Sequence, residues 1–343
     1  MPTVFVVCEG KHASLDVRLL DHVLAQKHYL PIRVIPGGSS PSISSRISAA
    51  IPTRSVSEVF LGILAYASGW YTIGLVIRGT RIVRSWYEEQ TNSESETIAV
   101  AVQDRDYQPL AKVDLLWQDP TERCLLWRFH EIENSLLTPW VIHDAFEEYR
   151  RTLNLSWVQN LSTTESEIEA VLHSQAARLY NDHIGKTLCY ELRSHKTTIG
   201  PTEINIPGGI DPLVGTEIEW QNAIASMIGK MHSACHAIVV HPAFQRVNVI
   251  QTWTRLEQQV RDPAFLQSGQ FRRDLNGKLL LNLLWQHLRQ DCRYPGNKKD
   301  FIEDLVQSFF RLYEPNSAFV IAEFEDLVQR IRALLVTPST SAQ

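Results

Sequence analysis

Three carboxylates in the first third of the chain have a type and spacing that could bind a metal ion. Glu9 follows the apolar run Thr3–Val7, and Asp104 and Asp106 follow the apolar run Thr97–Val102. Carboxylates at close range repel one another and stay ionised readily only when a cation joins them, and their oxygens suit Mg²⁺ or Mn²⁺. Such an ion can bind phosphate oxygens and activate water. The pattern therefore favours a metal site over three unrelated surface acids.

The segments around these acids predict an α/β domain. Both apolar runs are short and rich in β-branched residues, which is typical of buried strands. Ser14–Lys27 has apolar residues at helical spacing, and Pro31–Pro36 is another short β-rich run. A strand–helix–strand unit of this length predicts parallel strands with a right-handed crossover. Ligands collect at the carboxyl ends of parallel strands, and side chains two apart in an extended segment face the same way. We therefore expect Glu9, Asp104 and Asp106 to meet at one sheet edge.

The remaining sequence predicts a division into two domains. Cys124–Phe129 is a further strand candidate and extends the α/β domain over residues 1–140, with a helical insertion around residues 41–96. Residues 141–336 predict a mainly helical C-terminal domain, and residues 337–343 are small, polar and expected to fray. The helices expected in the second domain span residues 141–149, 165–180, 218–231, 244–257, 278–288, 300–311 and 319–335.

Composition and charge exclude some classes of protein. The 343 residues carry a net charge of −5, which does not indicate a generally basic nucleic-acid binder but leaves room for a local basic surface. Five scattered cysteines without a CxxC pair favour a reducing cytoplasm over a zinc site or disulfide framework. Val59–Val76 just reaches membrane-spanning length, but Gly69, Gly74 and its charged flanks favour a buried helix followed by a short strand or turn. The sequence lacks a P-loop motif, so any P-loop ATPase must be a separate polypeptide.

Four short segments carry a family resemblance. They are VVCEG (Val6–Gly10), AVQDRDY (Ala101–Tyr107), RFHEIENSLLTP (Arg128–Pro139) and NGKLL (Asn276–Leu280). Together they resemble TOPRIM-domain proteins, in particular the OLD-like and PARIS AriB-like bacterial defence nucleases. The resemblance implies a metal-dependent endonuclease acting on DNA or RNA, possibly transfer RNA, with a TOPRIM catalytic domain. It also implies an anti-phage role beside a separate ABC-type ATPase, and leaves a homodimer open.

The resemblance also assigns roles to single residues. Glu9 would be a metal ligand or general acid/base, Asp104 and Asp106 would hold the metal, and Lys11 and His130 could assist. Glu133, together with Glu131, would supply a further carboxylate; the alternative is an acid favoured at a helix N-terminus by the dipole. Related nucleases often carry an acid where this chain has Ala13, and Asp16 could replace it. That departure makes one metal ion easier to place than two. A TOPRIM module that binds nucleic acid, a nucleotide or a partner without turnover remains the alternative function.

Overall fold

The chain forms two compact units in the computed structural model. The structure describes residues 4–8, 14–36, 98–153, 155–195, 215–234, 241–314 and 317–336. Unit 1 comprises Met1–Arg105, Leu110–Arg128 and Phe309–Gln343, and unit 2 comprises Asp106–Pro109 and Phe129–Ser308. These bounds differ from the division predicted at residue 140, because residues 129–140 belong to the helical unit and the end of the chain belongs to the unit with the sheet.

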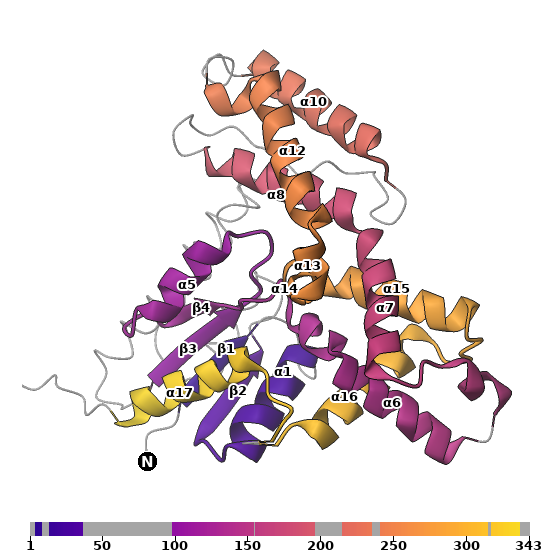
Figure 1. Ribbon diagram of the computed structural model, residues 1–343. Helices are drawn as coiled ribbons and strands as arrows, with labels where there is room; N and C mark the ends of the chain where they lie inside the picture. The colour runs from indigo at the N-terminus through magenta and orange to yellow at the C-terminus, as the bar shows by residue number, and fades with distance from the viewer. Residues whose placement is uncertain are drawn as a thin grey trace, which may run out of the picture. The chain divides into compact units, whose positions relative to one another are not determined.

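A parallel sheet organises unit 1. Its strands are β1 (Val4–Cys8), β2 (Ile32–Pro36), β3 (Ile98–Gln103) and β4 (Cys124–Leu126), in the order β2-β1-β3-β4 (Figure 1). Each described pairing is parallel, and side chains such as Val4, Val6 and Val100 are fully buried. Parallel strands are normally covered on both faces, which explains why these runs are almost continuously apolar. The predicted α/β class with parallel strands is confirmed.

Helices in unit 1 connect and cover the strands. The predicted helix between β1 and β2 is present as α1 (Leu15–Leu20), which continues into the π-helical segment η1 (Asp21–Lys27). The sequence did not predict α5 (Leu110–Gln118), which lies between β3 and β4. The ring of Trp117 on α5 donates from Nε1 to the carbonyl of Leu126 on β4 at 2.7 Å. This bond fixes α5 against the end of the sheet.

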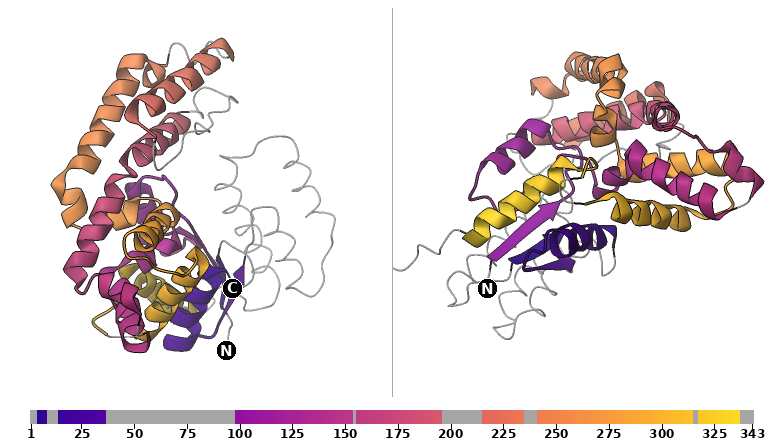
Figure 2. Two further views of the ribbon diagram at one scale, coloured as in Figure 1. Left: turned by 90° about the vertical axis from the view of Figure 1, so that its right-hand side faces the viewer. Right: turned by 60° about the horizontal axis from the view of Figure 1, so that its bottom comes forward.

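The last helix of the chain packs on the sheet of unit 1. In Figures 1 and 2, α17 (Ala322–Val336) runs beside the strands. Phe324 contacts Trp127 edge to face with ring centroids 5.4 Å apart, and the guanidinium of Arg330 donates to backbone carbonyls of Trp117 and Asp119. The sequence placed this helix in the C-terminal helical domain. Its position in unit 1 corrects that expectation, because periodicity reveals an apolar face but not the surface that covers it.

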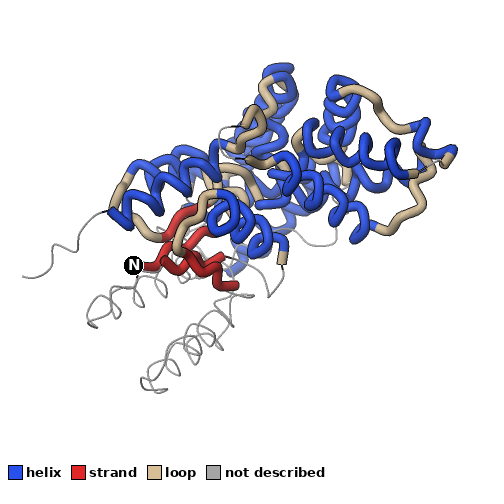
Figure 3. The backbone as a smooth tube through the Cα atoms, turned by 90° about the horizontal axis from the view of Figure 1, so that it is seen from below, coloured by secondary structure: helices blue, strands red, loops and turns tan. Residues whose placement is uncertain are grey.

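Unit 2 is built almost entirely from helices, which are blue in Figure 3. Each predicted helix overlaps an observed one, whereas α8 was not predicted as a separate element. The longer helices are α6 (Pro139–Thr152), α7 (Glu165–Ala177), α8 (Tyr180–Ser194), α10 (Glu217–Ala234), α12 (Arg246–Arg261), α15 (Gly277–Gln290) and α16 (Lys298–Leu312), whose last turn belongs to unit 1. Shorter ones are η2 (Ile132–Leu137), η3 (Ser156–Asn160), η4 (Pro242–Phe244), α13 (Pro263–Gln267) and α14 (Gln270–Asp274). Helix α8 packs against α10 and α12.

Several sequence-based expectations fall outside the described residues. They concern Glu9, Lys11, the insertion around residues 41–96, the apolar stretch Val59–Val76 and the tail 337–343. Among the helices that the structure describes, none is both long enough and apolar enough to cross a bilayer.

Candidate functional site

The two strands that precede the predicted metal ligands are neighbours in the sheet. β1 pairs with β3 in parallel register, with Cys8 opposite Val102. The chain therefore leaves both strands at the same sheet edge, side by side. The carboxyl ends of β1 and β3 are therefore neighbours, as the sequence predicted for these two strands. Glu9, which follows β1, lies outside the described residues.

The segment after β3 forms a turn rather than a continued strand. Asp104 is half-buried directly after β3, and Asp106 is exposed with a φ of 51°. This left-handed conformation is uncommon outside glycine and is tolerated best by Asp and Asn. The backbone N–H of Asp106 donates to the carbonyl of His130 at 3.3 Å. The extended geometry assumed for these two acids is therefore wrong, because the chain turns at Asp106.

The negative charge of Asp106 is disfavoured where it stands. Asp106 keeps access to solvent, but the surrounding protein partly desolvates its carboxylate, and this effect raises the pKa of Asp106 above its ordinary value. The charge of Glu131 raises this pKa further, while Lys278 lowers it. A divalent cation would reverse the balance by favouring the ionised carboxylate. On its chemistry, Asp106 fits a hard-metal ligand.

Glu131 has a different environment and a structural task. Its side chain is buried, with 6% of the residue exposed. Its carboxylate accepts from Asn276 Nδ2 at 3.2 Å, from the Lys278 backbone N–H at 3.0 Å and from Lys278 Nζ at 3.2 Å. Asn276 is the N-cap of α15, and its Oδ1 accepts from the Leu279 N–H at 2.8 Å. Glu131 thus completes the cap of α15, where a negative charge is favourable.

Asn134 and Gly277 hold the same junction together. Asn134 Oδ1 accepts from the Glu131 N–H at 2.8 Å, and Asn134 Nδ2 donates to the Leu275 carbonyl at 2.9 Å. A Cβ atom on Gly277 would lie 2.5 Å from Asn134 Oδ1, so only glycine fits without movement. Two of the segments that carry the family resemblance, Arg128–Pro139 and Asn276–Leu280, therefore dock on each other in unit 2.

Lys278 links the junction to the acids around it. Its Nζ lies 3.2 Å from Glu131 Oε1 and 3.7 Å from Glu133 Oε1, while 54% of its side chain stays exposed. Burial lowers the pKa of Lys298 below its ordinary value, and the charge of Glu133 opposes part of this effect. Sequence reasoning did not assign Lys278 a role. The available signal was its place in Asn-Gly-Lys at the start of a predicted helix.

The two remaining predicted site residues that the structure describes, His130 and Asp16, belong to different units. His130 is buried and meets the ring of Tyr107 edge to face, with centroids 4.6 Å apart. Burial and the charges of Asp182, Glu131 and Asp106 hold the pKa of Tyr107 well above its usual range. Asp16 lies half-buried in the first turn of α1 in unit 1. Within the described residues, no three His, Cys, Asp or Glu side chains converge closely enough to hold a metal ion.

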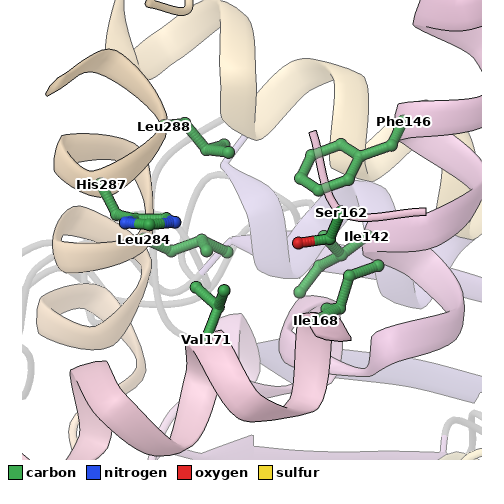
Figure 4. A pocket seen from close by; sticks show the side chains of 8 residues that line it. All are labelled: Ile142, Phe146, Ser162, Ile168, Val171, Leu284, His287 and Leu288. Carbon is green, nitrogen blue, oxygen red and sulfur yellow. The ribbon is translucent and has the colours of Figure 1, made fainter. Parts of the chain in front are cut away.

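A hollow between α6, α7 and α15 has fewer polar side chains than the surroundings of Asp106 and Glu131 (Figure 4). Six of its eight lining residues are apolar, among them Phe146, Ile168 and Leu284, and the other two are Ser162 and His287. His287 Nδ1 lies 2.5 Å from Asp291 Oδ2, one turn along the same helix. These features suit a packing defect between helices better than a catalytic centre.

Comparison with known proteins adds no relative: no protein-family model matches the chain, and no curated protein matches its sequence. The candidate site therefore depends on the register of β1 and β3 and on the surroundings of Asp106. Both observations concern the segment that the sequence singled out.

Proposed function

We propose that the chain is a divalent-metal-dependent nuclease whose parallel sheet belongs to a TOPRIM-type domain, and that Glu9, Asp104 and Asp106 are the ligands of Mg²⁺ or Mn²⁺. The observation that supports this most is the parallel pairing of β1 with β3 and the register of Cys8 with Val102. That register makes the carboxyl ends of β1 and β3 neighbours, and α/β proteins bind their ligands at this edge of the sheet. The resemblance of the short segments supplies the step from metal site to nuclease.

The proposed reaction is hydrolysis of a phosphodiester bond. The oxygen of a water molecule bonds to phosphorus, the bond from phosphorus to the leaving oxygen breaks, and a proton from water ends on that oxygen. The bound ion supplies charge neutralisation at the phosphate and acidifies the water. Asp104 and Asp106 would hold the ion together with Glu9, and Glu9 would also accept or return the proton. Partial desolvation of Asp106 strengthens its attraction to a cation.

The proposed setting follows from the family resemblance. It includes a DNA or RNA substrate, possibly a transfer RNA, and anti-phage defence under the control of a separate ABC-type ATPase. A homodimer is compatible with this setting. Purified chain mixed with the separate ATPase should co-elute with it, or change its cleavage rate, if the ATPase regulates it.

The direct test is cleavage by the full chain. Purified protein is incubated with Mg²⁺ and either plasmid DNA or pooled cellular RNA, beside Asp104→Asn, Asp106→Asn and the matched control Asp300→Asn. Asp300 is an exposed acid near the N-terminus of α16. Cleavage by the wild type and by Asp300→Asn, but by neither of the other variants, is the expected result. Equal cleavage by Asp104→Asn and wild type would remove the assignment.

A binding module without turnover is the second candidate. The turn at Asp106 and the lack of three converging metal-ligating side chains among the described residues favour it. Thermal unfolding with increasing Mn²⁺ separates the two, because a ligand that binds the folded state raises the melting temperature. Saturable stabilisation that Asp106→Asn removes would support the nuclease site, whereas a melting temperature that Mn²⁺ leaves unchanged would favour the binding module.

A further inference from the structure

Two histidines of unit 1, at the π-helical segment η1 and its end, contact the last part of the chain. π-helical turns are rare and often occur at functional sites. The first histidine, His22, is buried, with 7% of the residue exposed. Its ring stacks on that of Phe310 in the last turn of α16, with centroids 4.1 Å apart and planes at 23°. Its Nδ1 lies 3.1 Å from Gln26 Oε1 on the same segment. His22 therefore fastens η1 to the end of α16.

The second histidine, His28, fastens η1 to α17. It is the C-cap of η1, and only 4% of its side chain is exposed. Its Nε2 lies 3.2 Å from Tyr313 Oη and 3.3 Å from Glu325 Oε1. Its Nδ1 lies 3.3 Å from a terminal nitrogen of Arg332, about two turns beyond Glu325 on α17. Because a guanidinium only donates hydrogen bonds, Nδ1 must accept one. The ring is therefore neutral, with its proton on Nε2.

The surroundings of His22 suit an uncharged ring. Burial lowers the pKa of His22 below its ordinary value, the hydrogen bond to Gln26 opposes part of this effect, and the charge of Lys27 adds to it. The guanidinium of Arg18 also lies 5.9 Å from the centre of the Phe310 ring, so a cation is already present beside that ring. The charged groups near His22 are Arg18, Asp21, Lys27 and Glu314, the last two of which form an ion pair.

A proton on His28 would break its contact with Arg332. The charged groups that face the ring are Glu325 and Arg332, both from α17, and Tyr313 adds a hydroxyl. The new proton must bind Nδ1, because Nε2 already carries one. Two donors would then face each other, and the imidazolium and guanidinium charges would repel. Glu325 would instead gain an ion pair, so α17 would stay attached at its first turn and be released near Arg332.

We propose that η1 forms an acid-sensitive clasp, in which His22 and His28 hold the end of α16 and the second half of α17 while both rings are neutral, and release them on protonation. Every contact of the clasp lies in unit 1 and none involves the acidic turn, so the inference is independent of the proposed nuclease function. The folded chain binds a proton at His22 less readily than the unfolded chain does, because the pKa of His22 is lowered. Stability should therefore be lost as pH falls from 6.5 through the lowered pKa, and stay level below it.

The test follows amide hydrogen exchange of the full chain at about pH 7.5 and about pH 5, on either side of ordinary histidine titration. Wild type is compared with the double variant His22→Phe and His28→Gln, which keeps an aromatic ring at one position and an uncharged hydrogen-bonding group at the other. His143→Gln is the matched control, because His143 lies on α6 in unit 2. After correction for the intrinsic exchange rate, α17 of wild type and of the control should exchange on the order of tenfold faster at the lower pH. In the double variant, α17 should exchange at the same corrected rate at both pH values.

Three exchange results would overturn the clasp. One is an unchanged exchange rate of α17 in wild type at the lower pH. Another is an equal rise in α15 of unit 2, which would indicate a general loosening of the chain. The third is a double variant that keeps the wild-type dependence on pH. If the double variant does not fold, nuclear magnetic resonance of the His22 ring decides the matter in wild type. Titration below pH 6.5 would support the clasp, whereas titration at or above pH 6.5 would contradict a ring that the fold keeps neutral.

Discussion

The acidic turn Asp104–Tyr107 and the segment His130–Asn134 contain the same kind of residue in opposite circumstances. In the second segment, Glu131 is buried and receives three hydrogen bonds from the start of α15. In the first, Asp106 is exposed, has a left-handed backbone and carries a charge that its surroundings disfavour. Of these two carboxylates, only that of Glu131 has its negative charge balanced by the fold. The carboxylate of Asp106 is the one that would gain from a cation.

The same contrast shows that a residue in a family-like segment can have a structural role instead of a chemical one. The segments around Glu131 and Gly277 resemble parts of a nuclease family, yet their described contacts with each other are those of a helix cap and a close backbone approach. Such contacts explain why these residue types occur together without giving each a chemical role. Lys278 is the exception, because it takes part in the cap and also reaches solvent.

Replacement of Asp106 by Asn should have the largest effect and tests the first half of the contrast. The change removes the carboxylate proposed to bind the metal but keeps a residue that tolerates the left-handed conformation. Cleavage of plasmid DNA or pooled RNA should fall on the order of 10³-fold, with an unchanged circular dichroism spectrum. Asp106→Ala should lose the same activity and also destabilise the chain by about 1 kcal/mol, because alanine fits a positive φ poorly. Wild-type cleavage rates in Asp106→Asn would place the chemistry elsewhere.

Replacement of Glu131 by Ala tests the second half. Asn276 Nδ2, the Lys278 backbone N–H and the half-exposed Lys278 ammonium would lose their buried acceptor, so the free energy of unfolding should fall by about 2–4 kcal/mol. Urea unfolding measures the change. Glu131→Gln, which keeps one acceptor oxygen, should lie between wild type and Glu131→Ala. A loss below about 0.5 kcal/mol would mean that Glu131 is not the structural carboxylate described here.

Replacement of glycine by alanine should have opposite effects on stability at Gly277 and at Gly229. Gly277→Ala should destabilise the chain by about 1–3 kcal/mol, because its Cβ would meet Asn134 at 2.5 Å. Gly229→Ala in α10 should stabilise by about 0.5–1 kcal/mol through helix propensity, because no atom that the structure describes outside the backbone of α10 lies within 4 Å of the new Cβ. Thermal or urea unfolding of both variants provides the measurement. Stabilisation by Gly277→Ala would show that the junction with Asn134 is looser than the structure describes.

Local sequence pattern predicted the elements better than their partners. Three of the four described strands were predicted from short β-branched runs and the fourth from the apolar run Cys124–Phe129, because such runs are typical of strands buried on both faces. Helix α8 was not predicted, and it contains Gly185, whose Cβ would lie 2.3 Å from the Trp220 ring. Gly185 therefore allows α8 to approach α10 closely, and this contact joins residues 35 positions apart that no local period relates. The return of α17 to the sheet likewise depends on contacts such as Trp127 with Phe324, which no local period encodes.

The candidate site was predicted in part for the same reason. The order of strand ends follows from topology, so the meeting of β1 and β3 could be expected from the sequence. The turn at Asp106 could not, because Asp-Arg-Asp is compatible with both extended and left-handed backbone. The pairing of Glu131 with Lys278 joins residues that are 147 positions apart. A long-range contact of this kind has no signature in the spacing of either segment.

The smallest expected effect is a dependence of stability on pH that comes from Asp106 alone. The pKa of Asp106 is raised above its ordinary value of 3.8, so the folded chain binds this proton more tightly than the unfolded chain. Stability should therefore fall as pH rises from 3.8 through the raised pKa, and stay level above it. Asp106→Asn has no such proton to lose. Without divalent ions, its stability relative to wild type should therefore rise between pH 3.8 and the raised pKa.

Urea unfolding of both proteins at several pH values, with a chelator present, measures the difference. Mn²⁺ added at neutral pH should restore the wild type relative to Asp106→Asn, because the ion binds the ionised carboxylate of the folded state. Glu131 supplies the contrast, since its variants should lose stability whether or not Mn²⁺ is present. A wild type that becomes more stable relative to Asp106→Asn as pH rises, without any metal, would mean that the charge of Asp106 is balanced by the fold after all.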